Sequence, residues 1–372
     1  NNTAVGQSAL GSNTTGTNNV AVGSLAGDAI TTASNNVAIG AHALTTDTLG
    51  SGSIAIGRQA LNAQNFTSAT TSYNVAVGDQ AGLSVTTGVQ NTFVGGLAGD
   101  ATDDGSYNVA VGLQALSANC GDRNTAVGES ALSLTTAGNN TGIGNGAGKA
   151  ITTGANNTFV GAETGDATDD GSNNTAVGQS ALSANCADAN TAIGNSAAIA
   201  CTGADNTVVG YYAGGQLTSG SRNLILGHES GSNLFSNGLF QVTTHNDRIV
   251  LGTTEATNAY IQIDWTVVSD ERDKTEIQDV SQGLDFVKQL RPISYKFKTN
   301  RDDATPKGNT KYGFSAQDVL ALEGSSPVIV DNEESDKLKL TSAHIIPVLT
   351  KAIQEQQALI EALTARITTL EG

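Results

Sequence analysis

The chain has 372 residues, and its 44 Gly and only 16 aromatic residues argue against conventional globular cores throughout and favour a repeat architecture. The net charge of -17 is unevenly spread, because residues 1–227 hold four Lys or Arg against 14 Asp or Glu, whereas residues 228–372 hold 14 against 21. The first part therefore has no basic stripe, which argues against nucleic-acid binding. No run of about 18 apolar residues is present, so no membrane insertion and no signal peptide are predicted.

A short motif repeats along the first 231 residues. Asn stands four residues before a glycine in 13 of 14 copies, with Ser53 as the exception; Val, Ile or Leu stands directly before it, and Ala stands three after it in 12 of 14. The step is 16 or 17 residues, except for one step of 21 between Gly57 and Gly78. The motif glycines are residues 6, 23, 40, 57, 78, 95, 112, 128, 144, 161, 178, 194, 210 and 227.

Each repeat reads as one coil of a β-solenoid. A short strand such as Thr3–Val5 is followed by a turn at the glycine, a small-residue segment such as Ala9–Leu10 and a closing loop. Coils stacked about 4.8 Å apart would pair their strands along the axis. We expect the aliphatic residues to form an inner ladder and the Asn amides to bond one another from coil to coil. A flexible low-complexity tract fits the composition but not these fixed positions.

A longer period of 66 residues relates residues 99–132 to residues 165–198. It duplicates an acidic cluster, which makes a weak candidate for calcium binding because carboxylates on a glycine turn suit a hard cation. The spacing matches no complete calcium loop, and Asp-Gly turns are common in solvated loops, so no metal and no cofactor are predicted. The candidate residues are Asp100, Asp103 and Asp104 with their copies Asp166, Asp169 and Asp170.

The three cysteines do not predict a disulfide framework. Cys120 and Cys186 are equivalent residues several coils apart. Cys186 and Cys201 lie about one coil apart and could be neighbours, although a role as small buried residues is the favoured interpretation.

The segment Asn-Asn-Thr-Ala-Val-Gly-Gln-Ser-Ala-Leu, at residues 1–10 and 173–182, resembles the head repeat of trimeric adhesins of the YadA type. The resemblance covers residues 1–231. It implies a trimeric left-handed parallel β-roll, and the fold class we expect is mainly β: coils of about 16–17 residues followed by a C-terminal α+β chaperone module that ends in a coiled-coil helix.

The repeat period ends after Gly231, and residues 232–268 are expected to form a β-rich neck. Alternating residues predict strands at residues 239–242, 248–252 and 260–265. Beyond the neck we expect a helix over Ser281–Leu290, ended by Pro292, then a strand over Ile293–Lys298 and a charged loop over residues 299–311.

Residues 343–371 predict a terminal helix with a heptad pattern. Packing rules for Ile and Leu at its core positions lean toward a dimer, and Gln356 could fix the register. The alternative is that the helix packs on its own module. The heptad residues are Ile346, Leu349, Ile353, Ile360, Leu363, Ile367 and Leu370.

At the boundary between the neck and the final module stands Ser269-Asp270-Glu271-Arg272-Asp273-Lys274, with a serine five residues before a lysine. In one interpretation Ser269 is a nucleophile and Lys274 its general base, which requires a neutral amine and hence a pKa lowered by burial. In the other, the segment is a polar turn with Ser269 as a helix N-cap.

Residues 269–372 resemble the peptidase S74 family, the intramolecular chaperone at the C-terminus of phage tail fibres, tailspikes and endosialidases. The shared motifs, in the family's order, are Ser269 to Lys274, Leu290-Arg291-Pro292 with Tyr295-Lys296-Phe297, Gly313 to Val319, Pro327 to Val330, and Lys351 to Gln357. The resemblance implies a trimeric module that aligns three chains, promotes folding of the upstream β-structure and releases itself by autoproteolysis at Ser269. We favour the Val268–Ser269 bond, because the hydroxyl can reach its own upstream carbonyl.

The function expected is a phage tail fibre that folds and trimerises through a self-cleaving chaperone, with no activity on external substrates. The alternatives are a bacterial trimeric surface adhesin and the non-catalytic distal part of a polysaccharide depolymerase tailspike. The expected partners are two further copies of the chain, a host surface receptor of glycan or outer-membrane type, and other tail proteins. Because the sequence lacks Met, we expect a fragment whose N-terminal attachment region is missing. The expected location is the virion, after assembly in the host cytoplasm.

Overall fold

The computed structural model describes residues 1–232, 240–253, 255–256, 262, 267–298, 303–333 and 335–371. It forms two compact units, Asn1–Ala256 and Thr257–Gly372.

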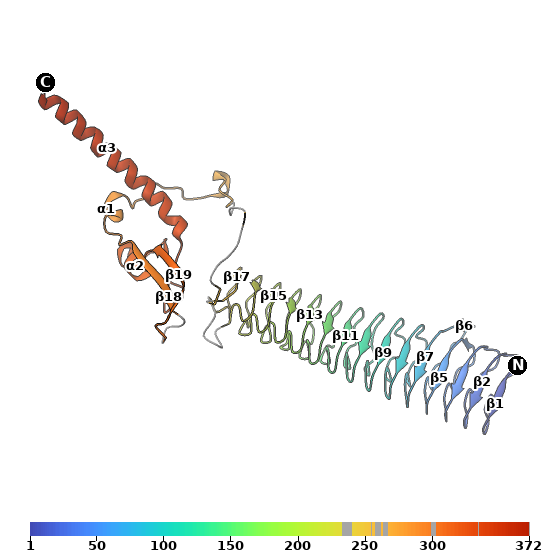
Figure 1. Ribbon diagram of the computed structural model, residues 1–372. Helices are drawn as coiled ribbons and strands as arrows, with labels where there is room; N and C mark the ends of the chain where they lie inside the picture. Colours follow the sequence, from blue (N-terminus) through green and yellow to red (C-terminus); the bar gives the residue numbers. More distant parts are fainter. Residues whose placement is uncertain are drawn as a thin grey trace. The chain divides into compact units, whose positions relative to one another are not determined.

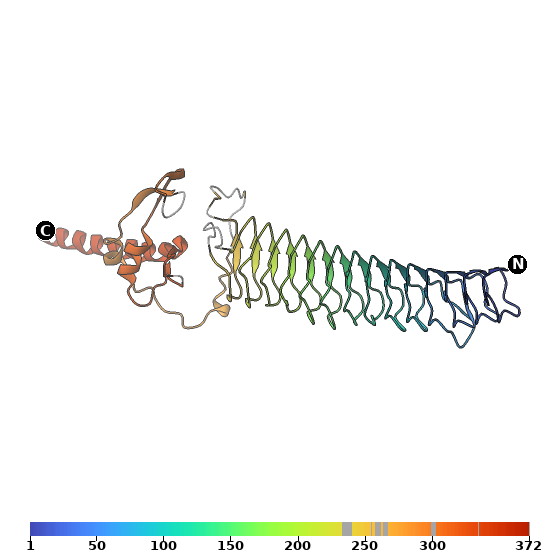
Figure 2. The same ribbon diagram turned by 90° about the horizontal axis from the view of Figure 1, so that it is seen from below.

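The first unit is a parallel β-solenoid in which each coil contributes one three-residue strand to a single ladder of 15 strands. Figures 1 and 2 show the coils stacked in sequence order. Equivalent residues lie opposite one another, as in Thr3↔Val20 and Ala4↔Ala21. The strands are β1 Thr3–Val5, β2 Val20–Val22, β3 Val37–Ile39, β5 Ile54–Ile56, β7 Val75–Val77, β8 Thr92–Val94, β9 Val109–Val111, β10 Thr125–Val127, β11 Thr141–Ile143, β12 Thr158–Val160, β13 Thr175–Val177, β14 Thr191–Ile193, β15 Thr207–Val209, β16 Leu224–Leu226 and β17 Ile249–Leu251.

The expected orientation of the aliphatic residues is wrong. The middle residue of each strand points inward, and the Val, Ile or Leu before the glycine points outward, as Val111 does at 37% exposure beside the buried Ala110. The coil is narrow, so alanine fills most of the inward positions. The outward residues form an apolar row along the array; its most exposed members are Val5, Val22, Ile39, Val94, Val111, Val127, Ile143, Val177, Ile193 and Leu251.

Two positions of each coil fill the core together, the middle residue of the strand and the residue four after the motif glycine. The residue four after the motif glycine is a buried leucine in coils such as that of Leu116 and a glycine in others. Where it is glycine, a larger group fills the space: a Cβ added at Gly99 would lie 2.6 Å from the ring of the buried Phe93. Phe159 and Gly165 repeat this arrangement one 66-residue period later.

The motif glycines have positive φ and touch the next coil. Gly95 has φ 135°, and a Cβ there would lie 2.5 Å from the carbonyl oxygen of Gly112. No residue with a side chain fits without moving the neighbouring backbone.

The buried Asn residues form a ladder, but its bonds differ from those expected. The Asn91 Oδ1 atom accepts from the backbone N–H of Asn108 (2.9 Å), and its Nδ2 donates to the carbonyl of Gly105 (2.8 Å). Amide-to-amide bonds occur only near the end of the described ladder, as between Asn206 and Asn190 (3.0 Å). The main chain is the usual partner because both amide ends can then be satisfied within the stack. Asn108 and Asn174 are exceptions, since the Nδ2 atom of each is buried without a hydrogen-bond partner.

The longer coil between Gly57 and Gly78 adds a second small ladder, β4 (Gly50–Ser51) with β6 (Thr70–Thr71). Ser53 replaces the ladder Asn here, and the buried Gln64 bonds both Asp47 (2.6 Å) and Ser53 (2.8 Å). Asp47 is fully buried, and this burial raises its pKa, against the opposing effect of its hydrogen bonds.

The ladder continues past Gly231 to β17, which confirms the strand expected around residues 248–252. The strand expected at residues 239–242 is not formed in its described part, where Val242 instead donates to the carbonyl of Gly231 (3.0 Å). Leu239 and, apart from Gln262, the strand expected over residues 260–265 lie outside the described residues.

The second unit is α+β. It contains η1 Glu271–Asp273, α1 Leu284–Val287, β18 Ile293–Lys298, β19 Pro306–Gly313, α2 Ala316–Glu323, β20 Val330–Asp331, β21 Lys339–Leu340, η2 Ser342–His344 and α3 Ile345–Glu371. Its small core consists of the buried residues Val319, Ile329, Val330, Ile345 and Val348 and the side chains that pack on them.

The terminal helix and the strand β18 are confirmed, whereas the predicted loop over residues 299–311 is wrong in its described part. There β19 pairs antiparallel with β18 and forms a hairpin. The expected helix over residues 281–290 is reduced to the single turn α1 and the turn after it. Within the described residues, no helix is long and apolar enough to cross a membrane.

Candidate self-cleavage site

A tight turn brings Ser269 and Lys274 together. The 3-10 helix η1 folds the chain back, with Asp273 N–H bonded to the carbonyl of Asp270 (3.2 Å). The Lys274 Nζ atom then lies 2.8 Å from Ser269 Oγ and 3.1 Å from the Ser269 carbonyl oxygen. A hydroxyl and an amine at this distance can exchange a proton, as a serine nucleophile and its base must.

The sequence interpretation that made Ser269 an N-cap does not hold, since Asp270 caps this turn. The Asp270 Oδ1 atom accepts from the backbone N–H of Arg272 (2.9 Å). Its carboxylate also holds the Arg272 guanidinium, with contacts of 3.0 and 2.6 Å. The hydrogen bonds from Arg272 lower the pKa of Asp270, which favours its ionised form.

Ser269 and Lys274 are both exposed in the single chain, as is Val268 on the upstream side of the expected cut. The segment is therefore accessible, but water surrounds the amine. A neutral lysine base needs burial, which the single chain does not supply.

Ion pairs and hydrogen bonds link the other shared motifs within the same unit. Arg291 forms an ion pair with Asp318 of α2 (2.8 Å), which joins the Leu-Arg-Pro motif to the Gly313–Val319 motif. Ser315 caps α2 by accepting from the N–H of Asp318 (3.3 Å). Glu323, at the end of α2, accepts from three successive backbone N–H groups at residues 328–330 (2.8, 2.8 and 3.0 Å) and so holds the start of β20.

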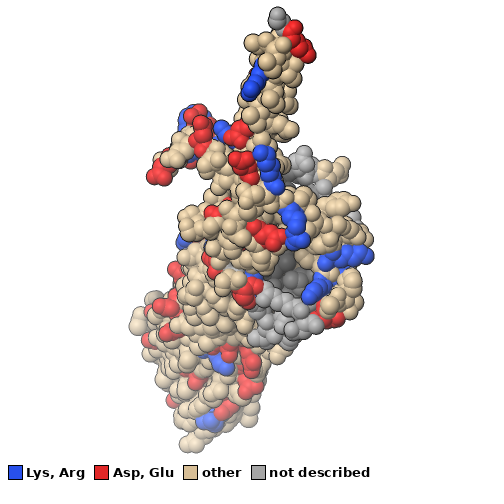
Figure 3. All heavy atoms as spheres, turned by 90° about the vertical axis from the view of Figure 1, so that its left-hand side faces the viewer, with Lys and Arg blue, Asp and Glu red and all other residues tan. Residues whose placement is uncertain are grey.

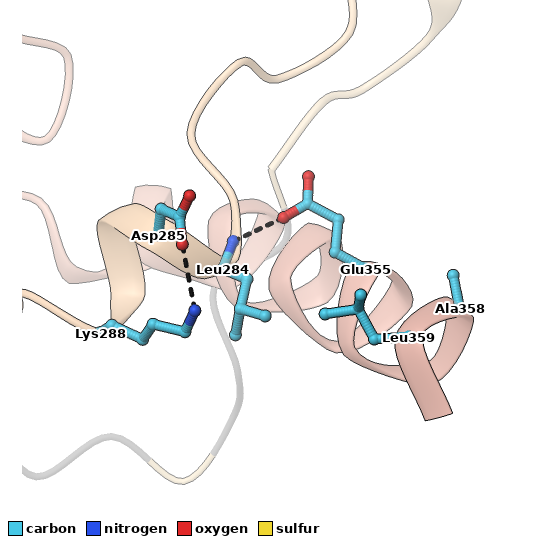
Figure 4. Close-up of a pocket in the computed structure, with 6 residues that line it drawn as sticks. All are labelled: Leu284, Asp285, Lys288, Glu355, Ala358 and Leu359. Carbon is cyan, nitrogen blue, oxygen red and sulfur yellow. Dashed lines mark hydrogen bonds and ion pairs between the residues drawn. The ribbon is translucent and has the colours of Figure 1, made fainter. Parts of the chain in front are cut away.

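Glu355 links the terminal helix to α1. Its Oε2 atom accepts from the backbone N–H of Leu284 (2.7 Å), and together with Leu359 it lines a small hollow shown in Figure 4. A Cβ at Gly283 would lie 2.3 Å from the carboxylate, so a larger residue there would have to displace the Glu355 side chain. The sequence analysis did not identify Asp270, Glu323 and Glu355 as structural residues. Asp270 and Glu323 precede the N–H groups that they bond by a few residues, which was an available signal, whereas nothing in the sequence indicates the long-range bond of Glu355.

The acidic clusters of the array do not form a metal site in the described part of the chain, where no group of three or more His, Cys, Asp or Glu side chains could hold an ion. Asp103 accepts from the Thr86 hydroxyl, and Asp166 pairs with Lys149 (3.4 Å). Asp100 keeps one buried carboxylate oxygen without a hydrogen-bond partner, and burial raises its pKa.

The three cysteines are free and buried, as the favoured interpretation had it. Burial raises the pKa of the Cys201 thiol to about 12, so this side chain is an inert core group. On the face seen in Figure 3, acidic and basic side chains are interspersed, without a continuous basic stripe.

Comparison with known proteins matches residues 269–325 to the model of the peptidase S74 family, described as the chaperone of endosialidase. The match begins at Ser269 and includes Lys274 and the Arg291–Asp318 pair. Neither the curated proteins nor the solved structures give a match. The family match and the β-solenoid before it together support a C-terminal intramolecular chaperone domain in this chain.

Proposed function

We propose that the chain is the distal part of a trimeric phage tail fibre whose C-terminal chaperone aligns three copies, assists folding of the solenoid and then cuts itself free. The observation that carries the proposal is the Lys274–Ser269 contact of 2.8 Å at the first residue of the chaperone match. The fibre would act in the virion, after assembly in the host cytoplasm, by binding a host surface receptor, and would join other tail proteins through a region preceding this sequence.

Two apolar surfaces support a trimer. The outward row of strand residues runs the length of the array, and a solenoid with an alanine-rich core gains stability by covering such a row. The heptad residues of α3 are also exposed in the single chain, as at Ile353 (65%) and Ile367 (54%). Three copies side by side would cover both, and we propose the left-handed β-roll trimer for the array.

The proposed cut is one intramolecular acyl transfer followed by hydrolysis. Lys274, once neutral, takes the proton of the Ser269 hydroxyl as Oγ attacks the carbonyl carbon of Val268. The Val268–Ser269 C–N bond breaks, the proton passes to the Ser269 nitrogen, and an ester links Val268 to Oγ. Water then hydrolyses the ester and leaves a carboxylate on Val268. A reaction that runs once per chain tolerates a weak base.

Trimer assembly supplies a reason for the timing of the cut. Near-identical coils are prone to register slips, and three chains must start aligned. A C-terminal clamp fixes the register once, and its removal leaves the folded fibre kinetically trapped.

Self-cleavage is tested by expressing the chain beside Ser269→Ala and Lys274→Met. We expect the original to yield the array fragment and both variants to stay intact. Lys288→Met is the matched control, since Lys288 is an exposed lysine in a surface ion pair with Asp285 (3.1 Å) and should leave cleavage unchanged.

The mass of the fragment identifies the bond, because a product ending at Val268 supports the proposed cut. A product ending at Ser269 would instead mark the next peptide bond, whose carbonyl Lys274 contacts. An original chain that stays intact, or cleavage that persists in Ser269→Ala, would refute autoproteolysis. Light scattering checks assembly, and a monomeric array fragment would refute the trimer.

No observation specifically favours the other two expected roles, a bacterial adhesin or a depolymerase tailspike, and they remain alternatives.

A further inference from the structure

One edge of the solenoid carries two exposed tyrosines at a corner where asparagine is the most frequent residue. The residue directly before each ladder Asn turns this corner with positive φ, and in several coils it is Asn, as at Asn35, Asn139 and Asn156. Among the coils that differ, four consecutive ones have the corner residues Tyr73, Gln90, Tyr107 and Arg123. We call these four residues the corner patch.

The backbone stacks the patch in register. The Gln90 N–H bonds the carbonyl of Ser72 (2.7 Å), the Tyr107 N–H that of Val89 (3.0 Å), and the Arg123 N–H that of Ser106 (3.0 Å). Each corner therefore lies over the one before it. Tyr73 and Tyr107 are two coils apart, which places them about 10 Å from one another.

The tyrosines occupy a conformation that does not suit them. Their φ values of 49° and 62° lie in the left-handed region, which asparagine tolerates much better than a bulky side chain does. Yet the rings gain little burial in return, since Tyr73 is 63% and Tyr107 47% exposed. Corners with positive φ recur along the array, so this backbone conformation belongs to the fold. What is particular to these two positions is a large exposed ring that serves neither the core nor the turn, and this indicates a role in binding.

The surroundings hold the rings in place. Gly52, the corner residue before Tyr73, has no side chain, and a Cβ there would lie 3.5 Å from the Tyr73 ring. At the other end the Arg123 guanidinium lies 5.5 Å from the centre of the Tyr107 ring. Gln90, between the rings, is exposed and offers both a donor and an acceptor. The additional β4–β6 ladder ends beside Tyr73 and can be followed in Figure 1.

From this arrangement we infer that the corner patch is a binding site for a neutral hexose polysaccharide. Exposed aromatic rings stack on the apolar faces of sugar rings, and an amide between them can bond hydroxyl groups. The separation of the two tyrosines fits a chain of a few linked hexoses. The array holds few cations among many carboxylates, so it would repel a strongly acidic glycan. The inference rests on the proposed role in receptor binding. It adds where on the array the receptor would bind and to which chemical class the receptor would belong.

The test is binding of the intact protein to immobilised neutral glucan, galactan and mannan oligosaccharides of two to eight units. We expect binding of at least one series, strengthening until the oligosaccharide spans both rings. The variant Tyr73→Asn/Tyr107→Asn should fold, because asparagine is the usual residue at this corner, and should lose at least tenfold in affinity. Tyr211→Ala, which changes an exposed tyrosine stacked on His228 elsewhere on the array, should bind like the original.

Several results would overturn the inference: no binding to any of the three series, unchanged binding by the double variant, or an altered oligomeric state in that variant, which would mark the patch as a contact between copies. Binding to a cell-surface fraction that protease abolishes and periodate does not would assign the patch to a protein partner instead. A chain that cuts itself and trimerises but binds none of the oligosaccharides would refute this site and leave the proposed chaperone function intact.

Discussion

The two units of the chain achieve order by different means. In the array, glycine, asparagine and alanine recur at fixed positions, and the same contacts recur along the stack, as in the bonds of Asn91 and Asn157 four coils apart. In the C-terminal unit, stabilising contacts occur once, such as the Arg291–Asp318 pair and the three bonds to Glu323. A contact that recurs along the array constrains the residue type at the same position of each coil. A contact that is made once constrains only the two residues that form it.

The difference is clearest for glycine. In the array a Cβ at Gly95 would overlap the backbone of the next coil. In the C-terminal unit, Gly324 also has positive φ, but a Cβ there would meet nothing within 4 Å. The array thus uses glycine for close backbone approach, whereas Gly324 of the C-terminal unit serves to turn the chain.

The largest effect is therefore expected for Gly95→Ala. Overlap with Gly112 and an unfavourable φ should together cost roughly 3–5 kcal/mol of local stability. Gly324→Ala should cost only about 1–2 kcal/mol, from the φ value alone. Hydrogen exchange of the intact chain, read coil by coil, measures both.

Gly96→Ala is the local control for this comparison, because its Cβ would make an ordinary contact of 3.5 Å with Leu113. Its effect should stay near zero. Equal losses of local stability for Gly95→Ala and Gly96→Ala would mean that the close backbone contact at Gly95 does not make a substitution there more destabilising.

The next effect is expected for Asn91→Ala, which removes two buried hydrogen bonds and leaves a backbone N–H and a carbonyl without partners. The expected loss is about 2–4 kcal/mol, again read by hydrogen exchange in the adjacent coils. Asn145→Ala, which removes an exposed bond to Glu129 (3.1 Å), should cost less than about 0.5 kcal/mol. Similar losses at both positions would contradict the importance of the Asn ladder.

The smallest effect concerns pH and Asp47, a buried carboxylate in the coil before the long one, which accepts a hydrogen bond from Gln64. Burial raises its folded-state pKa, so the folded form binds the proton more tightly than the unfolded form. The stability contributed by this group should therefore rise as the pH falls through the folded pKa, and should level off below the unfolded value near 3.9. Asp47→Asn should lack this dependence.

The measurement is the difference in unfolding free energy between the original and Asp47→Asn across the acidic range, since subtraction removes the other carboxylates. Asp79→Asn, at an exposed ion pair with Arg58, is the matched control and should show no comparable rise on acidification. A pH dependence that persists unchanged in Asp47→Asn would contradict the assignment.

The sequence predicts the coil, its glycine turn and the strand positions well, because all three follow from a strict period. It does not settle which side of each strand faces inward, since alternation allows either phase. Volume decides this: the interior accepts alanine and, where Gly82 and Gly99 make room, Phe93. The occurrence of Phe93 with glycine at both residues 82 and 99 is the sequence signal that could have indicated the correct phase.

At the candidate site, the spacing of Ser269 and Lys274 predicts their contact, because a short turn returns the chain within five residues. The Asp270–Arg272 pair that supports this turn depends on side-chain geometry that spacing alone does not give. The β18–β19 hairpin was missed because Pro306, Lys307 and Gly308 are typical of loops rather than strands.

Because the coils stack in register, the length of the array can change without a change in the way its coils pack. Because residues 99–132 recur at 165–198 and the strands at both places pair in the same register, residues 99–164 could be duplicated or removed without creating a new kind of interface. Each such step would change the array by about 19 Å, four coils at the strand spacing. The length of the array can thus evolve in steps of fixed size, while the C-terminal unit stays the same.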